Sequence, residues 1–227
     1  MAIRLSMFRR IPPHVRGRLV TRFTGWLAPA EMRWASKKAW WDGVFASEDP
    51  FFFDSNPREA LKYERTLALC GAGPFARALE IGCAEGAFTE RLAPRCRKLD
   101  ALDISAVAVQ RAADRTRSLP GVSCERRTLP VEFEKEAFDL IVASDVLYYL
   151  SVSDLEAALS AFERALAPGG GLVFVHYAPP MGAMLDGDEV HDALESLLTL
   201  EHTHAERVLL DGARYRFDRF DRRARRT

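Results

Sequence analysis

Short apolar runs alternate with helical patterns along residues 76–200, and this alternation constrains the fold more than any other feature of the sequence. Strands are predicted at 76–81, 98–104, 122–126, 138–144 and 172–175, and helices at 87–95, 105–116, 153–166 and 189–200. Such alternation is typical of a parallel sheet with helices on both faces. The pair Asp211-Gly212 between runs 206–210 and 214–220 indicates a hairpin. We therefore expect an α/β fold with a seven-stranded, mostly parallel sheet and an antiparallel C-terminal hairpin.

Capping and turn residues refine the expected bounds. Ser105 and Ser153 are expected to cap the helices that they open. Pro57 fits the first turn of a helix over 57–70. The Pro-Gly-Gly-Gly run at 168–171 predicts a turn before the fifth strand.

Charge is segregated along a chain whose formal net charge is zero. Residues 1–40 carry nine Lys or Arg and one acid, and residues 207–227 carry eight Arg and three Asp. The basic ends are interpreted as solvated arms or, alternatively, as a site for an anionic partner or a membrane surface. The neutral total argues against a general nucleic-acid binder.

Cysteine usage and hydropathy indicate a cytoplasmic protein. The four cysteines, at positions 70, 83, 96 and 124, form no CxxC pair, so reduced buried thiols are expected. No run approaches the roughly 20 apolar residues that span a bilayer, and the Arg-rich start lacks the apolar core of a secretory signal. Few carboxylates cluster at metal-ligand spacing, so no metal is expected.

A glycine-containing segment, Glu80-Ile81-Gly82-Cys83-Ala84-Glu85-Gly86, follows the first predicted strand and opens a helix. Glycine lets the backbone approach a ligand, and a helix N-terminus presents free N–H groups. The dinucleotide pattern would require glycine at Ala84 and Ala87, and no Gly-Lys-Ser/Thr follows as in a phosphate loop. Asp103 ends the second strand, where a carboxylate can accept both ribose hydroxyl protons. These features favour a ligand that carries a positive charge beside a nucleoside.

With these motifs the chain resembles the class I S-adenosylmethionine-dependent methyltransferases over about residues 60–178. Phe138-Asp139-Leu140-Ile141-Val142 and Leu166-Ala167-Pro168-Gly169-Gly170 match that class's fourth strand and the turn before its fifth. The resemblance implies a Rossmann-like fold and S-adenosylmethionine as the cofactor. It places these residues at the cofactor: Tyr63, Glu80, Gly82, Cys83, Ala84, Gly86, Phe88, Asp103, Ile104, Thr128, Leu129, Ser144 and Asp145. The class often has an Asp that meets the adenine amino group; here Thr128 takes that position, or Glu125 in another register.

A closer resemblance is to the nodulation protein S family, over about residues 48–178. It rests on Glu48-Asp49-Pro50, Lys62-Tyr63, Ala78-Leu79-Glu80-Ile81-Gly82-Cys83, Gly86-Ala87-Phe88-Thr89, Leu92-Ala93 and Val146-Leu147-Tyr148-Tyr149-Leu150. Members of that family methylate the free amine of a deacetylated chitin-like oligosaccharide. The resemblance implies a small-molecule acceptor, an amino sugar or related carbohydrate.

Catalytic candidates follow the fourth and fifth strands, because ligands of parallel α/β sheets bind beyond the carboxyl ends of the strands. His176 is the candidate general base, or a loop residue that only forms hydrogen bonds. Asp145 could orient an ammonium or accept its proton, or cap the next segment. Of the neighbours Tyr148 and Tyr149, one is expected to face the pocket, and Tyr148 is the candidate.

The first 56 residues form a basic, aromatic-rich extension ahead of a methyltransferase domain at 57–227. Ten of the 23 aromatic residues lie in the first 53 positions, and a helix is expected over 31–47. This segment either covers the core or serves as a lid over cofactor and acceptor, where aromatic faces stack on sugar rings or hold a cation.

Other functions remain open from the sequence. They are an O-methyltransferase of a sugar or secondary metabolite, an RNA or lipid-surface methyltransferase that uses the basic ends, a nicotinamide-dependent oxidoreductase, and a non-catalytic nucleotide-binding partner. The missing third glycine, at Ala87, counts against the oxidoreductase.

Overall fold

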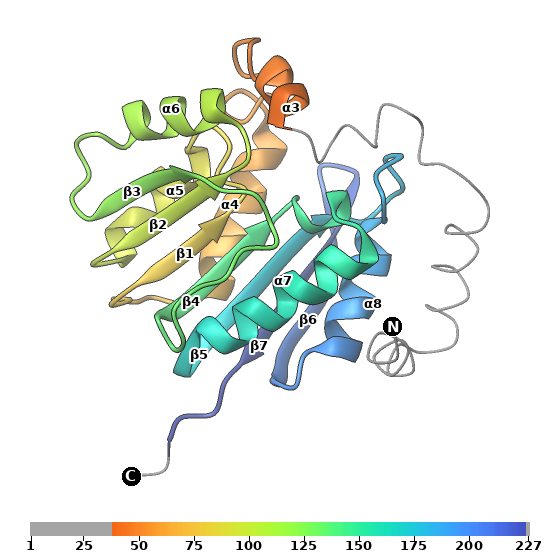
Figure 1. Ribbon diagram of the computed structural model, residues 1–227. Coiled ribbons are helices and arrows are strands. Elements are labelled where there is room, and N and C mark those ends of the chain that lie inside the picture. Colours follow the sequence, from red (N-terminus) through yellow and green to blue (C-terminus); the bar gives the residue numbers. More distant parts are fainter. Residues whose placement is uncertain (1–37, 226–227) are drawn as a thin grey trace.

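A seven-stranded sheet in the order β3-β2-β1-β4-β5-β7-β6 is the centre of the computed structural model, which describes residues 38–225 (Figure 1). The strands are β1 (Ala78–Ile81), β2 (Leu99–Asp103), β3 (Val122–Arg126), β4 (Phe138–Ser144), β5 (Leu166–Tyr177), β6 (Glu201–Leu210) and β7 (Ala213–Asp221). Strands β1 to β5 pair in parallel, whereas β7 lies antiparallel to both β5 and β6. The predicted fold class is therefore confirmed.

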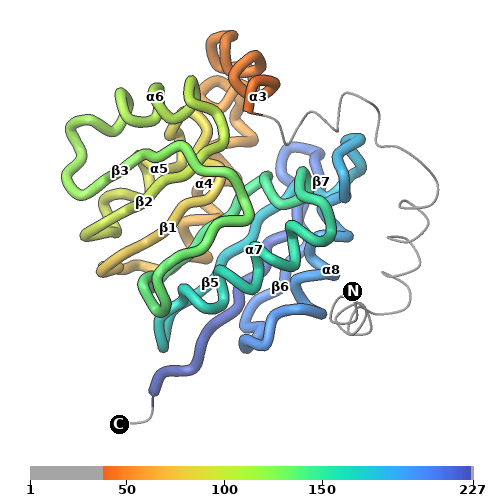
Figure 2. Tube along the Cα trace, in the orientation of Figure 1, coloured from red at the N-terminus to blue at the C-terminus, as the bar shows by residue number. Residues whose placement is uncertain are grey.

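Helices cover both faces of this sheet (Figures 1 and 2). They are α3 (Lys38–Val44), α4 (Pro57–Cys70), α5 (Ala87–Leu92), α6 (Ala106–Arg115), α7 (Val152–Ala165) and α8 (Gly187–Leu197), with 3₁₀ turns η3 (Ala93–Arg95) and η4 (Leu147–Tyr149). One core lies between the sheet and α7 and α8, around Phe162, Phe174 and Phe220. A second core lies on the opposite face beneath α4 and α5, around Leu92 and Phe217.

Most expected elements are present, but several bounds differ; β6, for example, begins at Glu201 and not at 206. Helix α7 is capped by Ser151, whose side chain accepts from the Asp154 N–H, and not by Ser153. Helix α8 begins before 189 because Asp186 and Glu189 form a capping box. The run at 168–171 belongs to β5 instead of a free turn, since Leu166 already pairs with Phe138 before the register shifts.

The strand order reverses between β1 and β4. After β1, the chain adds β2 and then β3 on one side of it, and then returns to add β4 and β5 on the other side. A crevice opens beyond the carboxyl ends of the strands at such a switch point. The segments after β1, β2 and β4 therefore converge on one place.

Candidate functional site

A cavity of about 420 Å³ opens where the segments after β1, β2 and β4 converge. Twelve of the thirteen predicted cofactor residues line it, together with the catalytic candidate Tyr148. These residues are Tyr63, Glu80, Gly82, Cys83, Ala84, Phe88, Asp103, Ile104, Thr128, Leu129, Ser144 and Asp145. Most of the predicted cofactor residues thus surround a single cavity.

The glycine loop shapes one wall of the cavity by its backbone. Gly82 has φ +76°, and a Cβ there would approach the Cβ of Val146 to 3.0 Å. Ala84 also adopts a positive φ, 46°, at the position where the methyltransferase class more often has glycine. Gly86 is the predicted residue that does not line the cavity. Its φ is +82° and a Cβ would meet the Ala112 Cα at 2.9 Å, so Gly86 permits close packing of α6 and not ligand contact.

Asp103 is held rigidly at the end of β2. Its Oδ2 accepts from the Ala84 N–H at 3.0 Å, and its Oδ1 accepts from the Ser105 N–H at 2.8 Å. Burial raises the pKa of Asp103 above its ordinary value. Each carboxylate oxygen keeps a lone pair for a further donor, because an ionised carboxylate can accept about four hydrogen bonds.

Oε2 of Glu80 and Oγ1 of Thr128 are two of the buried polar atoms in the cavity wall that lack a hydrogen-bond partner among residues 38–225. Buried polar atoms are normally paired, so each of these two is an acceptor ready for a ligand donor. Burial raises the pKa of Glu80 to about 7. The alternative adenine contact, Glu125, is exposed, binds Arg127 and does not line the cavity.

A buried ion-pair group, Lys62 with Glu59 and Asp145, lies in the same cavity, and Lys62 and Glu59 were not predicted as site residues. The Lys62 Nζ lies 2.6 Å from Glu59 Oε2 and 2.7 Å from Asp145 Oδ2. Burial alone would lower the pKa of Lys62. The carboxylates of Asp145 and Glu59 outweigh this effect and hold the pKa above its ordinary value, so the ammonium stays charged. The (i, i+3) spacing of Glu59 and Lys62 on α4 was visible in the sequence, but their burial depends on how α4 packs.

The turn after β4 carries Asp145 and Tyr148 into the cavity. The Asp145 Oδ1 accepts from the Tyr177 N–H at 2.8 Å and from the Tyr148 hydroxyl at 3.2 Å. Burial raises the pKa of Asp145, but the charge of Lys62 outweighs it and holds the pKa below its ordinary value. Asp145 is therefore an ionised acceptor, and Tyr148 is a neutral hydroxyl that donates to it.

His176 is placed differently from the expected general base. It is fully buried and does not line the cavity. Its Nε2 accepts from the Leu147 N–H at 3.3 Å, and its Nδ1 lies 3.0 Å from His191 Nε2. Burial and the neighbouring His191 hold the pKa of His176 well below its ordinary value. This geometry corrects the expected proximity to substrate and favours the alternative of a hydrogen-bonding residue.

The described part of the N-terminal extension contributes to the cavity wall. Trp41, Phe45, Phe51 and Phe53 line it, and the Trp41 ring lies 4.9 Å from the Tyr149 ring. Asp42 fastens α3 to the start of α6, since its Oδ1 accepts from the Ala106 N–H at 2.7 Å. Residues 1–37, which contain most of the predicted basic arm, lie outside the described residues.

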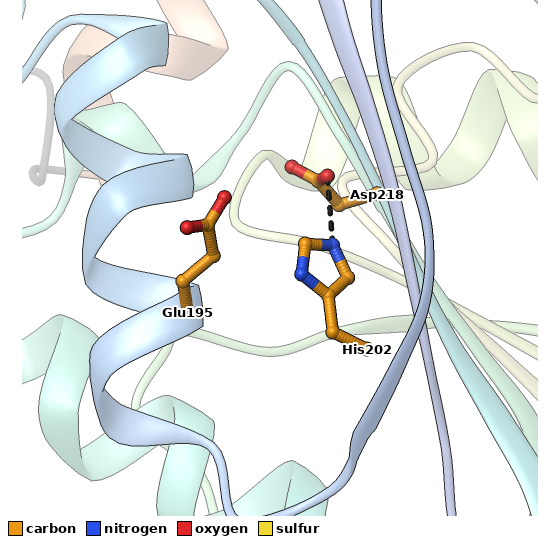
Figure 3. A group of neighbouring side chains, drawn as sticks. All are labelled: Glu195, His202 and Asp218. Carbon is orange, nitrogen blue, oxygen red and sulfur yellow. Dashed lines mark hydrogen bonds and ion pairs between the residues drawn. The ribbon is translucent and has the colours of Figure 1, made fainter.

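A second cluster of titratable side chains lies away from the cavity, between α8 and the hairpin. Glu195, His202 and Asp218 approach one another there (Figure 3). Arg216 already supplies a cation, because its guanidinium lies 3.0 Å from Glu195 and 3.7 Å from Asp218. A metal ion would have to compete with that guanidinium, so we assign the cluster no metal role.

Comparisons with known proteins identify the family of this chain. A family model described as Nodulation protein S (NodS) matches residues 36–179. Nodulation protein S of Rhizobium tropici is 42% identical over 131 residues, which are 57% of this chain and 55% of that protein. The Sinorhizobium fredii protein of the same name is 37% identical over 131 residues, or 57% of this chain and 61% of that protein. The alignments thus span less than two thirds of these curated relatives.

A solved structure extends the similarity to the whole catalytic fold. The crystal structure of N-methyltransferase NodS from Bradyrhizobium japonicum WM9, in complex with S-adenosyl-l-homocysteine, superimposes with a TM-score of 0.73. The two chains are 31% identical, and the match covers 82% of this chain and 97% of the other.

Proposed function

The chain belongs to the nodulation protein S family, and we propose that it transfers a methyl group from S-adenosylmethionine to the amine of an amino sugar or oligosaccharide. The cofactor supplies a methyl group on a sulfonium, which an in-line nucleophile accepts. The observation that carries the proposal is the cavity itself, whose lining contains both Asp103 and the buried group of Lys62, Glu59 and Asp145.

The residues of the cavity fit the cofactor. Asp103 would hold the ribose hydroxyls, and the unpartnered Oγ1 of Thr128 would meet the adenine amino group. The unpartnered Oε2 of Glu80 would accept from the cationic amino group of the methionine part. The cavity lining contains five acidic and three basic residues, a balance that favours a cationic ligand.

The acceptor end favours an amine over a hydroxyl. Asp145 is held ionised by Lys62, and Lys62 is held charged, so neither side chain is suited to remove a proton from a hydroxyl. A neutral amine brings its own lone pair. The Tyr148 hydroxyl donates to Asp145, and its oxygen remains able to accept an amine N–H and orient the nitrogen.

Aromatic residues support a carbohydrate acceptor. Phe51, Tyr149, Tyr177 and Tyr215 line the cavity as well as Trp41. Flat aromatic faces can stack on sugar rings and exclude water around the reacting atoms.

The alternative of an RNA or lipid-surface acceptor receives less support from the described C-terminal arginines. Arg219 pairs with Asp221, Arg223 with Glu201, and Arg225 with Glu136. Within residues 38–225 no helix is long and apolar enough to cross a membrane.

The proposal is tested by a tritiated-methyl assay over amino sugars, matched N-acetylated sugars, plain sugars, simple amines and RNA. We expect label only in compounds with a free amine, and most in amino sugars. Label in RNA or in plain sugars, with none in amines, would reject the proposed acceptor.

Cofactor affinity should depend on pH through Glu80. Its pKa is raised to about 7 by burial, and the ionised form attracts a cation. Binding of S-adenosylmethionine should therefore strengthen as pH rises through 7 and weaken below it, by up to about tenfold per pH unit. Calorimetry between pH 5.5 and 7.5, where an amino group stays largely protonated, measures this slope. The Glu80→Gln variant should bind more weakly and show no slope; a slope that persists in that variant would assign the titration to another group.

A further inference from the structure

A continuous series of buried hydrogen bonds runs from the turn after β4 to the edge strand β6. The Leu147 N–H contacts His176 Nε2 at 3.3 Å, and His176 Nδ1 lies 3.0 Å from His191 Nε2. His191 Nδ1 contacts Asp218 Oδ2, and Asp218 Oδ1 lies 3.0 Å from His202 Nε2. These residues belong to β5, α8, β7 and β6 (Figure 1), and Figure 3 shows the link between Asp218 and His202. His176, His191 and Asp218 are fully buried, and the His202 side chain is 27% exposed.

The direction of these hydrogen bonds is fixed by the chemistry at each end. A backbone N–H can only donate, so Nε2 of His176 must be unprotonated and accept from Leu147. The proton of neutral His176 then lies on Nδ1 and is donated to Nε2 of His191. His191 in turn carries its proton on Nδ1 and donates it to Asp218, which as a carboxylate only accepts. Each of these hydrogen bonds therefore allows only one tautomer of the histidine that it involves.

The turn that receives the first hydrogen bond forms part of the cavity. Asp145 and Tyr148 lie on either side of Leu147, and the whole turn docks on the end of β5 through the Asp145 N–H to Val175 O at 2.8 Å. Asp145 has φ +52°, a conformation that residues other than glycine adopt only when surrounding contacts hold it. Val146 packs against Gly82 of the glycine loop. Movement of this turn would therefore disturb the cavity wall both at Asp145 and at Gly82.

We propose that His176 is a positioning residue whose tautomer, set by His191 and Asp218, presents an acceptor to the Leu147 N–H and so holds the Asp145–Tyr148 turn in place. This role differs from general-base catalysis, because His176 contacts the backbone of the turn and does not line the cavity where the methyl-accepting substrate would bind. The expected effect on cofactor affinity rests on the proposed function. The tautomer of His176 is a property of the protein itself and does not depend on any ligand.

The tautomer can be measured directly on the unaltered protein. Long-range ¹H–¹⁵N spectra of histidine side chains separate protonated from unprotonated ring nitrogens. We expect protonated Nδ1 and unprotonated Nε2 for both His176 and His191. A protonated Nε2 on His176 would overturn the proposal whatever the protein binds.

Asp218→Asn changes the group that the His191 Nδ1–H meets. An asparagine amide can turn either its oxygen or its N–H group toward His191 Nδ1, and only the N–H group moves the His191 proton to Nε2 and forces the opposite tautomer on His176. Affinity for S-adenosylhomocysteine should follow the measured tautomer: unchanged where the tautomer is kept, and about tenfold weaker, the worth of one buried hydrogen bond, where it is inverted. His202→Gln is the matched control: it alters the other oxygen of Asp218 and should change neither the His176 tautomer nor the affinity. An inverted tautomer with unchanged affinity would overturn the positioning role.

Two substitutions of His176 itself separate a positioning role from other roles. They also test the proposal if Asp218→Asn does not fold. A glutamine at 176 can place its amide oxygen near the site of the imidazole Nε2, so His176→Gln should retain affinity for S-adenosylhomocysteine within about threefold. His176→Leu strands the Leu147 N–H and should lose about tenfold. Equal effects of the two substitutions would contradict the proposal, and loss of methyl transfer in both with affinity intact would restore His176 as the base.

Discussion

Asp103→Ala should abolish most of the affinity for S-adenosylmethionine. The carboxylate is fixed by the N–H groups of Ala84 and Ser105, and its remaining lone pairs face the cavity. Two hydrogen bonds from ribose hydroxyls to a charged acceptor are each worth about 1.5–3 kcal/mol, so the affinity should fall at least about a hundredfold. Titration calorimetry with S-adenosylmethionine and S-adenosylhomocysteine measures this loss.

The control for this variant is Asp100→Ala on the same strand. Asp100 pairs with Arg77 and with Ser123 and does not line the cavity. Its replacement should leave cofactor affinity unchanged within about twofold. If Asp103→Ala kept near-normal affinity while the thermal unfolding midpoint was unchanged, the assignment of the ribose site would be wrong.

Lys62→Met should both destabilise the fold and stop methyl transfer. The ammonium is 5% exposed and sits between Glu59 and Asp145, which are 10% and 23% exposed. Removal of one partner from a buried ion pair strands the opposite charge and costs about 3–5 kcal/mol. Urea unfolding at pH 7 measures the free energy of unfolding. The loss should shrink as pH falls, because protonation neutralises the stranded carboxylates.

Arg65→Met on the same helix is the matched control for Lys62. Arg65 pairs with Glu206, but the two side chains are 42% and 27% exposed, so its replacement should cost less than about 1 kcal/mol. Addition of Asp145→Asn to Lys62→Met should recover part of the lost stability, since one stranded charge disappears. Equal losses in Lys62→Met and Arg65→Met would show that the buried group contributes no more than a surface pair.

The proposed nucleoside half of the site could be predicted from the sequence because it depends on local backbone. A glycine-containing loop after β1 and an acid at the end of β2 are brought together by any parallel sheet in this strand order. Thr128 was also placed correctly in the cavity wall, since it follows β3 at the same edge.

The acceptor half depended on tertiary packing and was predicted less well. Lys62 and Glu59 read as ordinary helix charges until α4 packs beside the turn after β4. His176 follows the expected strand and has a useful pKa by type, but alternation along β5 turns its side chain toward α8 and away from the cavity. The cap of α7 was misplaced by two residues because Ser151 and Ser153 both suit a helix start.

The central claim is that cofactor and a free amine meet in this one cavity. The most direct measurement is methyl transfer from S-adenosylmethionine to a chitin-like oligosaccharide offered with free and with fully acetylated amines, with products analysed by mass spectrometry and NMR. We predict one or more added methyl groups on nitrogen for the free amine, none for the acetylated sugar, and none in either case with Asp103→Ala. Methyl groups on oxygen, or equal methylation of both sugars, would contradict this account.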